Sequence, residues 1–293
     1  MSRPSAFPHA DAPHPARHPV SDTHHGIART DDYAWMRAEN WQDVFRDPSL
    51  LDPGIRAHLE AENAYQSVLM ADTADLQKLL FSEMKGRIKE DDSSVPMKDG
   101  PYAYGSSFKL GGEQPRYFRT PRDGGRERIL LDGDIQAEGK AYFRLGGIDH
   151  SSDHARLLWA FDDKGSEFYT LCVRDLASGT DRAERINDTG GSGVWAADNE
   201  GFFYTRLDAN HRPSRIFFHK LGADAQTDRL IYEESDPGFF MNVGGTRDNR
   251  WIMISISDHE TSEYHLLSAS DPLAEPRLVA ARETGLQYDL EEG

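Results

Sequence analysis

Few residue patterns in this 293-residue chain approach the spacing that a catalytic site requires. A serine hydrolase of the α/β type holds its nucleophile in a Gly-x-Ser-x-Gly turn between a strand and a helix. The nearest match, Gly-Gly-Ser-Gly-Val at residues 190–194, lacks the last glycine, and its Ser192 begins a predicted strand. We interpret these residues as a flexible turn between two repeats, and we assign no catalytic residue to this chain.

Three acidic doublets have the composition of a glycosidase pair, which needs two carboxylates. They are Asp91-Asp92, Asp162-Asp163 and Glu233-Glu234. Each lies in a predicted turn or at the end of a predicted strand, where solvated acids are common. We therefore expect turn acids here rather than a catalytic pair.

Histidines offer a second kind of chemistry, because imidazole is a frequent metal ligand. Asp149, His150 and His154 lie together in the predicted turn between two strands of one repeat. A turn with polar side chains explains them more simply than a metal site does. Five other histidines are irregularly spaced and reflect the composition of the N-terminal tail; they are His9, His14, His18, His24 and His25. We expect no metal and no cofactor.

Composition narrows the classes of partner. The chain has 33 Lys and Arg against 50 Asp and Glu, a formal charge of −17, and a nucleic-acid partner would need clustered cations instead. The single cysteine, Cys172, excludes an internal disulfide, and its apolar neighbours predict a buried, inert thiol. No apolar run approaches the roughly 20 residues of a membrane-spanning helix, and the first 20 residues lack the apolar centre of a secretory signal. We expect a cytoplasmic protein with no nucleic-acid or membrane partner.

The elements that would position any site are revealed by a repeat. One pattern occurs three times, each copy 48 residues after the last, as Ser166-Glu167-Phe168-Tyr169, Ser214-Arg215-Ile216-Phe217 and Ser262-Glu263-Tyr264-His265. A turn precedes the second strand of each copy, at Asp153-His154, Asp198-Asn199 and Asp248-Asn249. Asp and Asn suit a turn that needs a left-handed residue. A period of about 40 to 50 residues built from short strands predicts a β-propeller with one blade per period.

The repeats occupy only part of the chain. Residues 1–25, rich in Pro and His, are predicted to be disordered. Residues 26–90 have helical periodicity, with Asp52-Pro53 opening one predicted helix and Thr73 capping a second. Neither helix carries enough apolar surface to be stable alone, so each must pack on another surface.

Residues 91–293 are predicted to form an incomplete propeller. Its four blades fall at about 94–140, 141–190, 191–237 and 238–284, and residues 286–290 are the predicted start of a fifth. The fold class is therefore mainly β, a partial propeller preceded by a helical arm. Because a propeller covers its strand edges by closing the ring, we expect these four blades alone to be poorly soluble or to self-associate.

Residues 29–37, Arg-Thr-Asp-Asp-Tyr-Ala-Trp-Met-Arg, resemble the Asp-x-Tyr-x-Trp-Leu opening signature of the prolyl oligopeptidase family of serine peptidases. Further segments are similar to motifs of the same family, in the same order, at residues 59–65, 83–88, 91–96 and 228–234. The resemblance covers residues 18–293. The Arg87-Ile88 segment and residues 229–234 look more like the oligopeptidase B branch than like prolyl oligopeptidase itself.

The resemblance implies a cytoplasmic oligopeptidase that cuts short peptides, basic ones in the oligopeptidase B branch, after Lys or Arg. It implies a seven-bladed propeller that limits substrate size, and a C-terminal α/β-hydrolase domain that carries the Ser, Asp and His of the triad. That triad is expected downstream of Gly293, so no catalytic or substrate-binding residue is assigned here. The helical arm, with Tyr33 and Trp35, is expected to dock on the hydrolase domain, although both aromatics could equally be ordinary core residues.

Two other functions are consistent with a propeller. A stand-alone propeller could bind peptides or proteins without chemistry, and a natural stop codon after Gly293 would favour it. A propeller glycosidase would need carboxylates on the first strand of each blade. The predicted first strands carry none; they are residues 142–145, 194–196 and 239–241.

Overall fold

A computed structural model describes residue 8 and residues 10–291 of the chain. The chain forms two compact units, Met1–Lys89 and Glu90–Gly293, which are described separately. His9 lies outside the described residues, as do residues 1–7 of the segment expected to be disordered. No helix among the described residues combines the length and apolarity needed to cross a membrane.

The first unit begins with a hairpin that the sequence did not predict. Strands β1 (Val20–His24) and β2 (Ile27–Asp31) pair antiparallel around a turn at His25-Gly26. Both turn residues have positive φ, 51° and 77°, as the common two-residue hairpin turn requires. The prediction of disorder up to residue 25 is therefore wrong for residues 20–25. Prolines favour the unpaired chain only as far as Pro19, and the strands follow it directly.

Short helices then lead into two longer ones. They are η1 (Ala34–Met36), α1 (Trp41–Arg46), η2 (Pro48–Leu50), α2 (Pro53–Leu69), η3 (Ala71–Thr73) and α3 (Ala74–Gly86). The Asp52 carboxylate accepts hydrogen bonds from the amides of Gly54 and Ile55, which confirms the predicted cap of α2. Thr73 precedes α3 but makes no capping bond, because its hydroxyl donates instead to the carbonyl of Met70.

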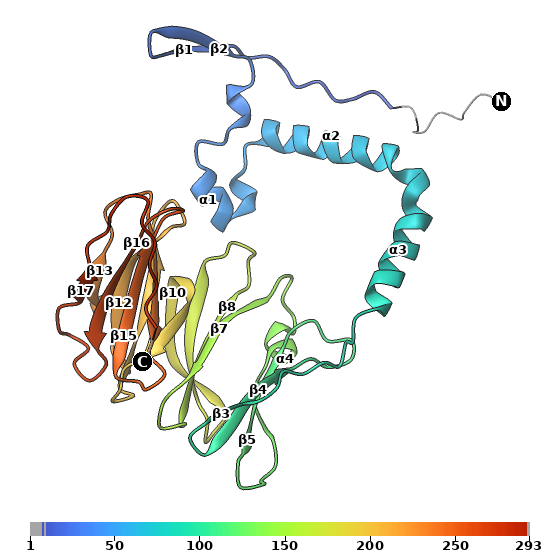
Figure 1. Ribbon diagram of the computed structural model, residues 1–293. Coiled ribbons are helices and arrows are strands. Elements are labelled where there is room, and N and C mark those ends of the chain that lie inside the picture. The colour runs from blue at the N-terminus through green and yellow to red at the C-terminus, as the bar shows by residue number, and fades with distance from the viewer. Residues whose placement is uncertain (1–7, 9, 292–293) are drawn as a thin grey trace. The chain divides into compact units, whose positions relative to one another are not determined.

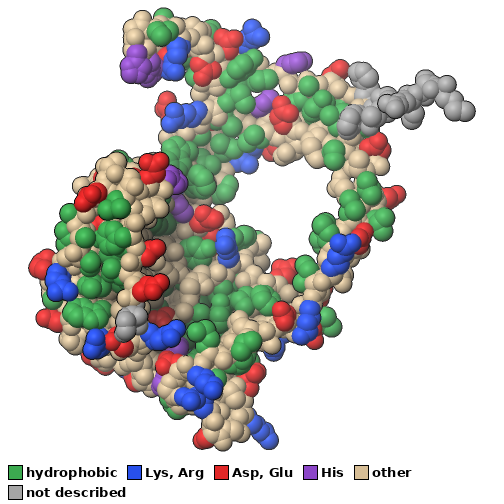
Figure 2. Space-filling model, in the orientation of Figure 1, with side chains coloured by type: hydrophobic (Ala, Val, Ile, Leu, Met, Phe, Trp, Pro, Cys, Tyr) green, Lys and Arg blue, Asp and Glu red, His purple; other side chains and the backbone are tan. Residues whose placement is uncertain are grey.

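The two long helices carry an uncovered apolar surface. Ile55 is the one buried residue among the described residues of α2, and α3 has none. Figure 2 shows apolar side chains at the surface along both helices. The exposed apolar residues of α3 are Leu76, Leu79, Leu80, Phe81 and Met84. This agrees with the expectation that these helices need another surface to pack on.

The second unit consists of antiparallel four-stranded blades, seen side by side in Figure 1. Blade one contains β3 (Met97–Asp99), β4 (Tyr102–Ser107), β5 (Arg116–Pro121) and β6 (Arg128–Asp132), followed by helix α4 (Gly133–Ala137). Blade two contains β7 (Arg144–His150), β8 (Arg156–Asp162), β9 (Tyr169–Asp175) and the first part of β10 (Thr180–Trp195). Blade three continues with the rest of β10, β11 (Gly201–Leu207), β12 (Pro213–Lys220), the short η4 (Ala225–Thr227) and β13 (Arg229–Glu233). Blade four contains β14 (Phe240–Gly245), β15 (Trp251–Ser257), β16 (Ser262–Ser268) and β17 (Arg277–Ala280).

One strand belongs to two blades. The sequence predicted separate strands on either side of residues 190–193, but β10 runs through them. Its first part pairs with β9 and its second part with β11, with register shifts around Thr189 and Gly193. Blades two and three therefore form a single seven-stranded sheet. The bulge at the intervening glycines turns the strand from one blade into the next.

The core lies between the blades, in three successive layers. Leu131 of blade one meets Trp159 of blade two. Leu158, the preceding residue on β8, faces the other way and meets blade three. The third layer lies between blades three and four and includes Phe203 and Ile254. This alternation along each strand buries both faces of an inner blade, which is the arrangement of a propeller and excludes a two-layer sandwich.

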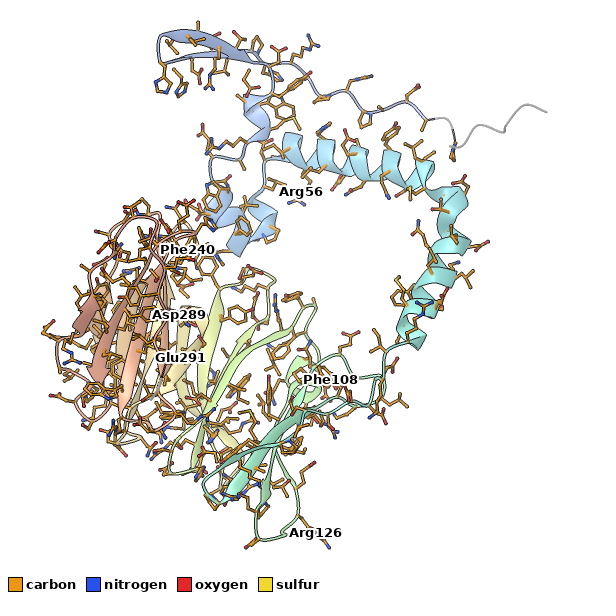
Figure 3. The ribbon with its side chains drawn as sticks, in the orientation of Figure 1. Arg56, Phe108, Arg126, Phe240, Asp289 and Glu291 are labelled. Carbon is orange, nitrogen blue, oxygen red and sulfur yellow. The ribbon has the colours of Figure 1, made fainter. Side chains whose placement is uncertain are left out.

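The repeated turns also match the prediction. The residue at the end of the turn before the second strand has positive φ in three blades, 59° at His154, 57° at Asn199 and 56° at Asn249. The amide of each bonds the carbonyl three residues earlier. The predicted fifth blade, by contrast, does not begin as a strand among the described residues. Residues 286–290 lie along β16 instead, where Tyr264 donates a hydrogen bond to the Asp289 carboxylate that Figure 3 labels.

Candidate functional site

The serine of residues 190–194 has no catalytic surroundings. Ser192 lies within β10, at the bulge, and not in a turn between a strand and a helix. No serine hydroxyl is hydrogen-bonded to a histidine among the residues that the structure describes. Its backbone instead approaches blade two closely, since a side chain at Gly147 would lie 2.9 Å from the Cβ of Ser192. The segment therefore serves packing between blades.

Residues of two of the three acidic doublets stabilise turns and contacts between blades. Asp162 is 2% exposed, and its carboxylate accepts the backbone amides of Lys164, Gly165 and Glu167. Asp163 pairs with Lys140 at 2.7 Å. Asp162 is thus a turn acid, as predicted, but a buried one, because backbone amides replace its water.

Glu234 takes part in a network between blades three and four. Its carboxylate pairs with Arg282, which also binds the Glu263 carboxylate. Glu263 in turn accepts a hydrogen bond from His265. Burial alone would raise the pKa of Glu263, but hydrogen bonds from Arg282 and His265 outweigh it and hold that pKa below its usual range. The network ties β16 and the chain after β17 to the end of β13.

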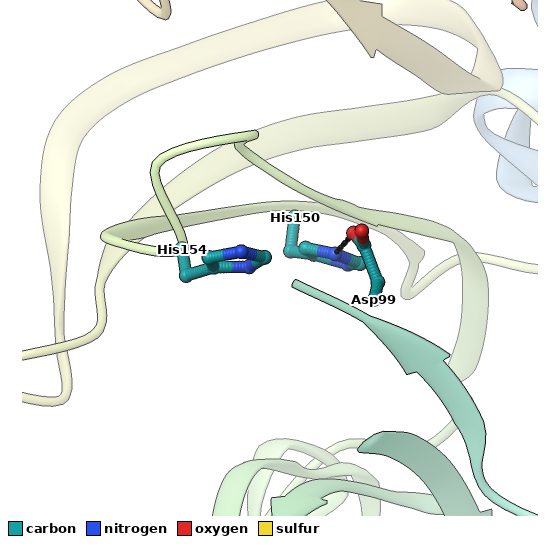
Figure 4. Close-up of side chains that lie close together, drawn as sticks. All are labelled: Asp99, His150 and His154. Atoms are coloured by element: carbon teal, nitrogen blue, oxygen red, sulfur yellow. Dashed lines mark hydrogen bonds and ion pairs between the residues drawn. The ribbon is translucent and has the colours of Figure 1, made fainter. Parts of the chain in front are cut away.

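The polar cluster with the richest chemistry joins blades one and two (Figure 4). It contains Asp99 at the end of β3, His150 at the end of β7 and His154 in the turn that follows β7. One candidate ligand atom from each lies within 4.8 Å of the others. Nε2 of His150 is 2.7 Å from a carboxylate oxygen of Asp99. We refer to these three residues as the Asp99 cluster.

The sequence identified both histidines of the Asp99 cluster but paired them with the wrong acid. Asp149 does not belong to the cluster. The backbone amide of Trp195 in blade three bonds its carboxylate, and the indole N–H of Trp195 donates to its backbone carbonyl. Burial raises the pKa of the Asp149 carboxyl to about 7. The acid that meets the histidines is Asp99, 51 residues before His150. Asp99 ends β3, the first strand of blade one, and the sequence did not predict that strand. Predicting it would have identified Asp99 as a candidate.

Tyr104 of β4 orients the two rings of the Asp99 cluster. Its ring stacks on that of His150 with centroids 3.7 Å apart. Its hydroxyl is 2.8 Å from Nδ1 of His154. Burial raises the pKa of the Tyr104 phenol and lowers that of His150. Both shifts reflect the cost of placing a charge in a half-buried aromatic contact.

A cavity of about 840 Å³ adjoins the Asp99 cluster. Blade one contributes residues 94–99 and blade two contributes Ile148 and His150, while Arg247 and Asn249 come from the turn of blade four. Tyr117 and Phe118 of β5 and Leu130 of β6 also line the cavity, so it extends from the first strands across the face of blade one. Its volume is within the range of sites that bind small molecules.

Comparisons with known proteins agree over nearly the whole chain. The family described as "Prolyl oligopeptidase, N-terminal beta-propeller domain" matches residues 13–293. Dipeptidyl aminopeptidase BI of Pseudoxanthomonas mexicana is 31% identical over 96% of this chain and 39% of its own length. Protease 2 of Moraxella lacunata is 28% identical over 91% of this chain and 38% of its own length. The chain therefore spans about two fifths of the length of these relatives.

Solved structures give the same picture. Oligopeptidase B from Leishmania major superposes with a TM-score of 0.83 at 27% identity, covering 98% of this chain and 41% of that one. Oligopeptidase B from Trypanosoma brucei, with covalently bound antipain, gives a TM-score of 0.82 at 27% identity over 94% of this chain and 40% of that one.

Proposed function

Because the chain belongs to the prolyl oligopeptidase family, as its N-terminal β-propeller domain, we propose that it is the propeller portion of a serine oligopeptidase similar to oligopeptidase B. The complete protein would hydrolyse short peptides after Lys or Arg. The observation that carries this proposal is the family match over residues 13–293, together with the likeness to two oligopeptidase B structures.

The division of labour follows from what the chain contains. A peptidase of this kind needs a serine, a base and an orienting group in mutual contact, and a further domain with the α/β-hydrolase fold would supply them. The uncovered apolar residues of α2 and α3 provide a surface on which that domain would pack. Residues 1–293 produced alone would then hydrolyse no peptide, and no cofactor would be needed.

The propeller would select substrates by size. The cavity of about 840 Å³ beside the Asp99 cluster is lined by residues of blades one, two and four. A space of that volume can hold a short segment of peptide but no folded domain. The blades would therefore exclude large proteins from the hydrolase domain without taking part in the chemistry.

Charge supports the preference for basic peptides. The formal charge of −17 produces a field that raises the local concentration of cationic ligands. A cytoplasmic setting is part of the proposal, and the one cysteine fits it, because Cys172 is buried between blades with its pKa raised to about 12 by burial. That thiol has no role in the reaction.

A second candidate follows from the identity of 31% with dipeptidyl aminopeptidase BI. A dipeptidyl aminopeptidase, as its name states, removes dipeptides from a free amino end. The two activities differ in whether the substrate needs that free end. The choice therefore depends on substrate recognition and leaves the fold unchanged.

The test uses the product of the complete gene and one basic octapeptide in two forms, with a free and with an acetylated amino end. We expect cleavage of both forms after the Lys or Arg, identified by mass spectrometry, and loss of activity with a serine-directed phosphonate. Release of dipeptides from the free form alone would support the second candidate. Absence of hydrolysis from both forms would favour a stand-alone binding module and overturn the proposal.

A further inference from the structure

The Asp99 cluster has the donor set of a transition-metal site. It offers two imidazole nitrogens and one carboxylate oxygen, which are ligands that Zn²⁺ accepts in proteins. Asp99 comes from blade one, and His150 and His154 come from blade two. We propose that these three residues bind one Zn²⁺-type divalent ion, which would link blade one to blade two beside the cavity described above.

The geometry needs only small movements of exposed side chains. In a tetrahedral zinc site with bonds of about 2.0 to 2.1 Å, neighbouring ligand atoms are about 3.3 Å apart. The Asp99 oxygen and Nε2 of His150 are 2.7 Å apart, and no pair in the cluster exceeds 4.8 Å. The Asp99 side chain is 54% exposed, so it can rotate to admit the ion. The open fourth position would be filled by water.

The residues around the cluster hold its rings as a metal site requires. Ligating histidines usually have the second ring nitrogen hydrogen-bonded, which fixes the ring and its tautomer. The Tyr104 hydroxyl holds Nδ1 of His154, which leaves Nε2 for the ion. That nitrogen lies beside Gly100, where an added Cβ would be only 2.4 Å away. Glycine at this position therefore keeps space for the His154 ring next to Asp99.

The repeat shows that blade two departs from the other blades at this point. Blades three and four have Asn199 and Asn249 at the turn position that His154 occupies, with nearly the same φ. Asn199 reaches the preceding blade, because its side chain accepts hydrogen bonds from Ser152. A contact between blades therefore needs only asparagine, whereas histidine adds a metal-binding nitrogen close to a second histidine.

The surrounding charges favour zinc over calcium or magnesium. The cluster has a single carboxylate, and Arg119 is nearby, where its guanidinium donates to the carbonyl of His154. Hard cations such as Ca²⁺ need several oxygen ligands. An ion held by imidazole nitrogens tolerates the low negative charge better.

The experiment measures Zn²⁺ binding to the product of the complete gene, by equilibrium dialysis with metal analysis and by thermal unfolding. His154→Asn is the main variant, because asparagine serves the same turn in blades three and four. We expect the parent protein to retain one more equivalent of Zn²⁺ than His154→Asn, and Zn²⁺ to raise the unfolding temperature of the parent only. Co²⁺ should give the visible absorption of a four-coordinate site, which Asp99→Asn should lose.

Two further variants separate this site from adventitious binding. His24→Asn removes a histidine of the N-terminal hairpin that is 3.1 Å from the Asp22 carboxylate, and it should bind as the parent does. Tyr104→Phe keeps the ring that stacks on His150 but loses the hydroxyl, so its Kd should rise about 10- to 100-fold. Equal binding by the parent and His154→Asn, or no Zn²⁺ retained by the parent, would overturn the proposal.

Discussion

At the scale of single residues, glycines decide how closely the strands around the β10 bulge can pack. Gly146 of β7 lies where an added Cβ would be 2.8 Å from the carbonyl oxygen of Gly191, 2.9 Å from the Tyr169 ring and 3.0 Å from Cβ of Ala160. Gly244 of β14, on the first strand of blade four, has no atom within 4 Å of the same position. The sequence alone does not distinguish these two glycines, and only the structure shows which one is crowded.

These two glycines give a matched pair of mutations. Gly146→Ala should lower the free energy of unfolding by about 1–3 kcal/mol, because the backbone at Gly191 cannot move without disturbing the bulge of β10. Gly244→Ala should leave it unchanged or raise it by up to about 1 kcal/mol, since alanine has less freedom in the unfolded chain. Urea denaturation followed by tryptophan fluorescence measures both. Equal losses in the two variants would contradict this account.

The Asp99 cluster shows how far residue-level prediction could go. His150 and His154 are four residues apart, so local spacing brought them together in the sequence. Asp99 and Tyr104 come from another blade, and their contact with the histidines depends on how two sheets pack. No periodicity within one blade carries that information. Sequence reasoning therefore supplied two of the three proposed ligands and chose a neighbouring acid for the third.

At the scale of elements, strands were predicted well because each has a two-residue period between turn residues. The predicted first strands, at residues 142–145, 194–196 and 239–241, overlap β7, β10 and β14. The fusion of two strands into β10 was missed, because Gly190 and Gly191 read as a break when they form a bulge. Residues 286–290 have the alternating pattern of a strand but form no strand ladder. They contact β16 through side-chain hydrogen bonds and one backbone hydrogen bond, from the amide of Ser262 to the carbonyl of Leu286.

The two helix caps give the element-scale prediction. Asp52→Ala removes two hydrogen bonds to free amides of α2 and should cost about 1 kcal/mol. Thr73→Ala, before α3, removes a hydroxyl that caps no backbone amide of that helix, although it accepts from the side chain of Gln77, and should cost less than about 0.5 kcal/mol. Helix content and stability, measured by circular dichroism during urea denaturation, compare the two. A larger loss for Thr73→Ala would show that sequence position, and not the observed bond, determines the cap.

At the scale of the whole molecule, stability depends on burying each blade on both sides. Ile252, Ile254 and Ile256 of β15 are buried against blade three. The opposite face of the same strand carries Trp251 and Met253, which are only partly buried. Part of the face that another blade would cover is therefore apolar, as in other repeat arrays whose units stack on neighbours.

Exposed apolar surface in both units predicts that residues 1–293, produced alone, self-associate. Leu76 and Leu79 of α3 are 54% and 63% exposed on a surface that we propose packs on a hydrolase domain. Without that domain, burial of this surface between copies of the chain is favourable by roughly 25 cal/mol per Å². Sedimentation velocity should show a mass that rises with protein concentration over the micromolar range.

A double variant distinguishes this surface from general stickiness. Leu76→Glu/Leu79→Glu should lower the weight-average mass toward that of a monomer, because two charges on α3 oppose the burial of that helix against a second copy. Leu110→Glu is the matched control, because Leu110 is 80% exposed in a loop of blade one. That loop belongs to the second unit of the chain, whereas α3 belongs to the first. Leu110→Glu should leave association unchanged. If residues 1–293 produced alone stay monomeric at all concentrations, the helical arm needs no partner. The docking surface assigned to α3 would then have to be abandoned.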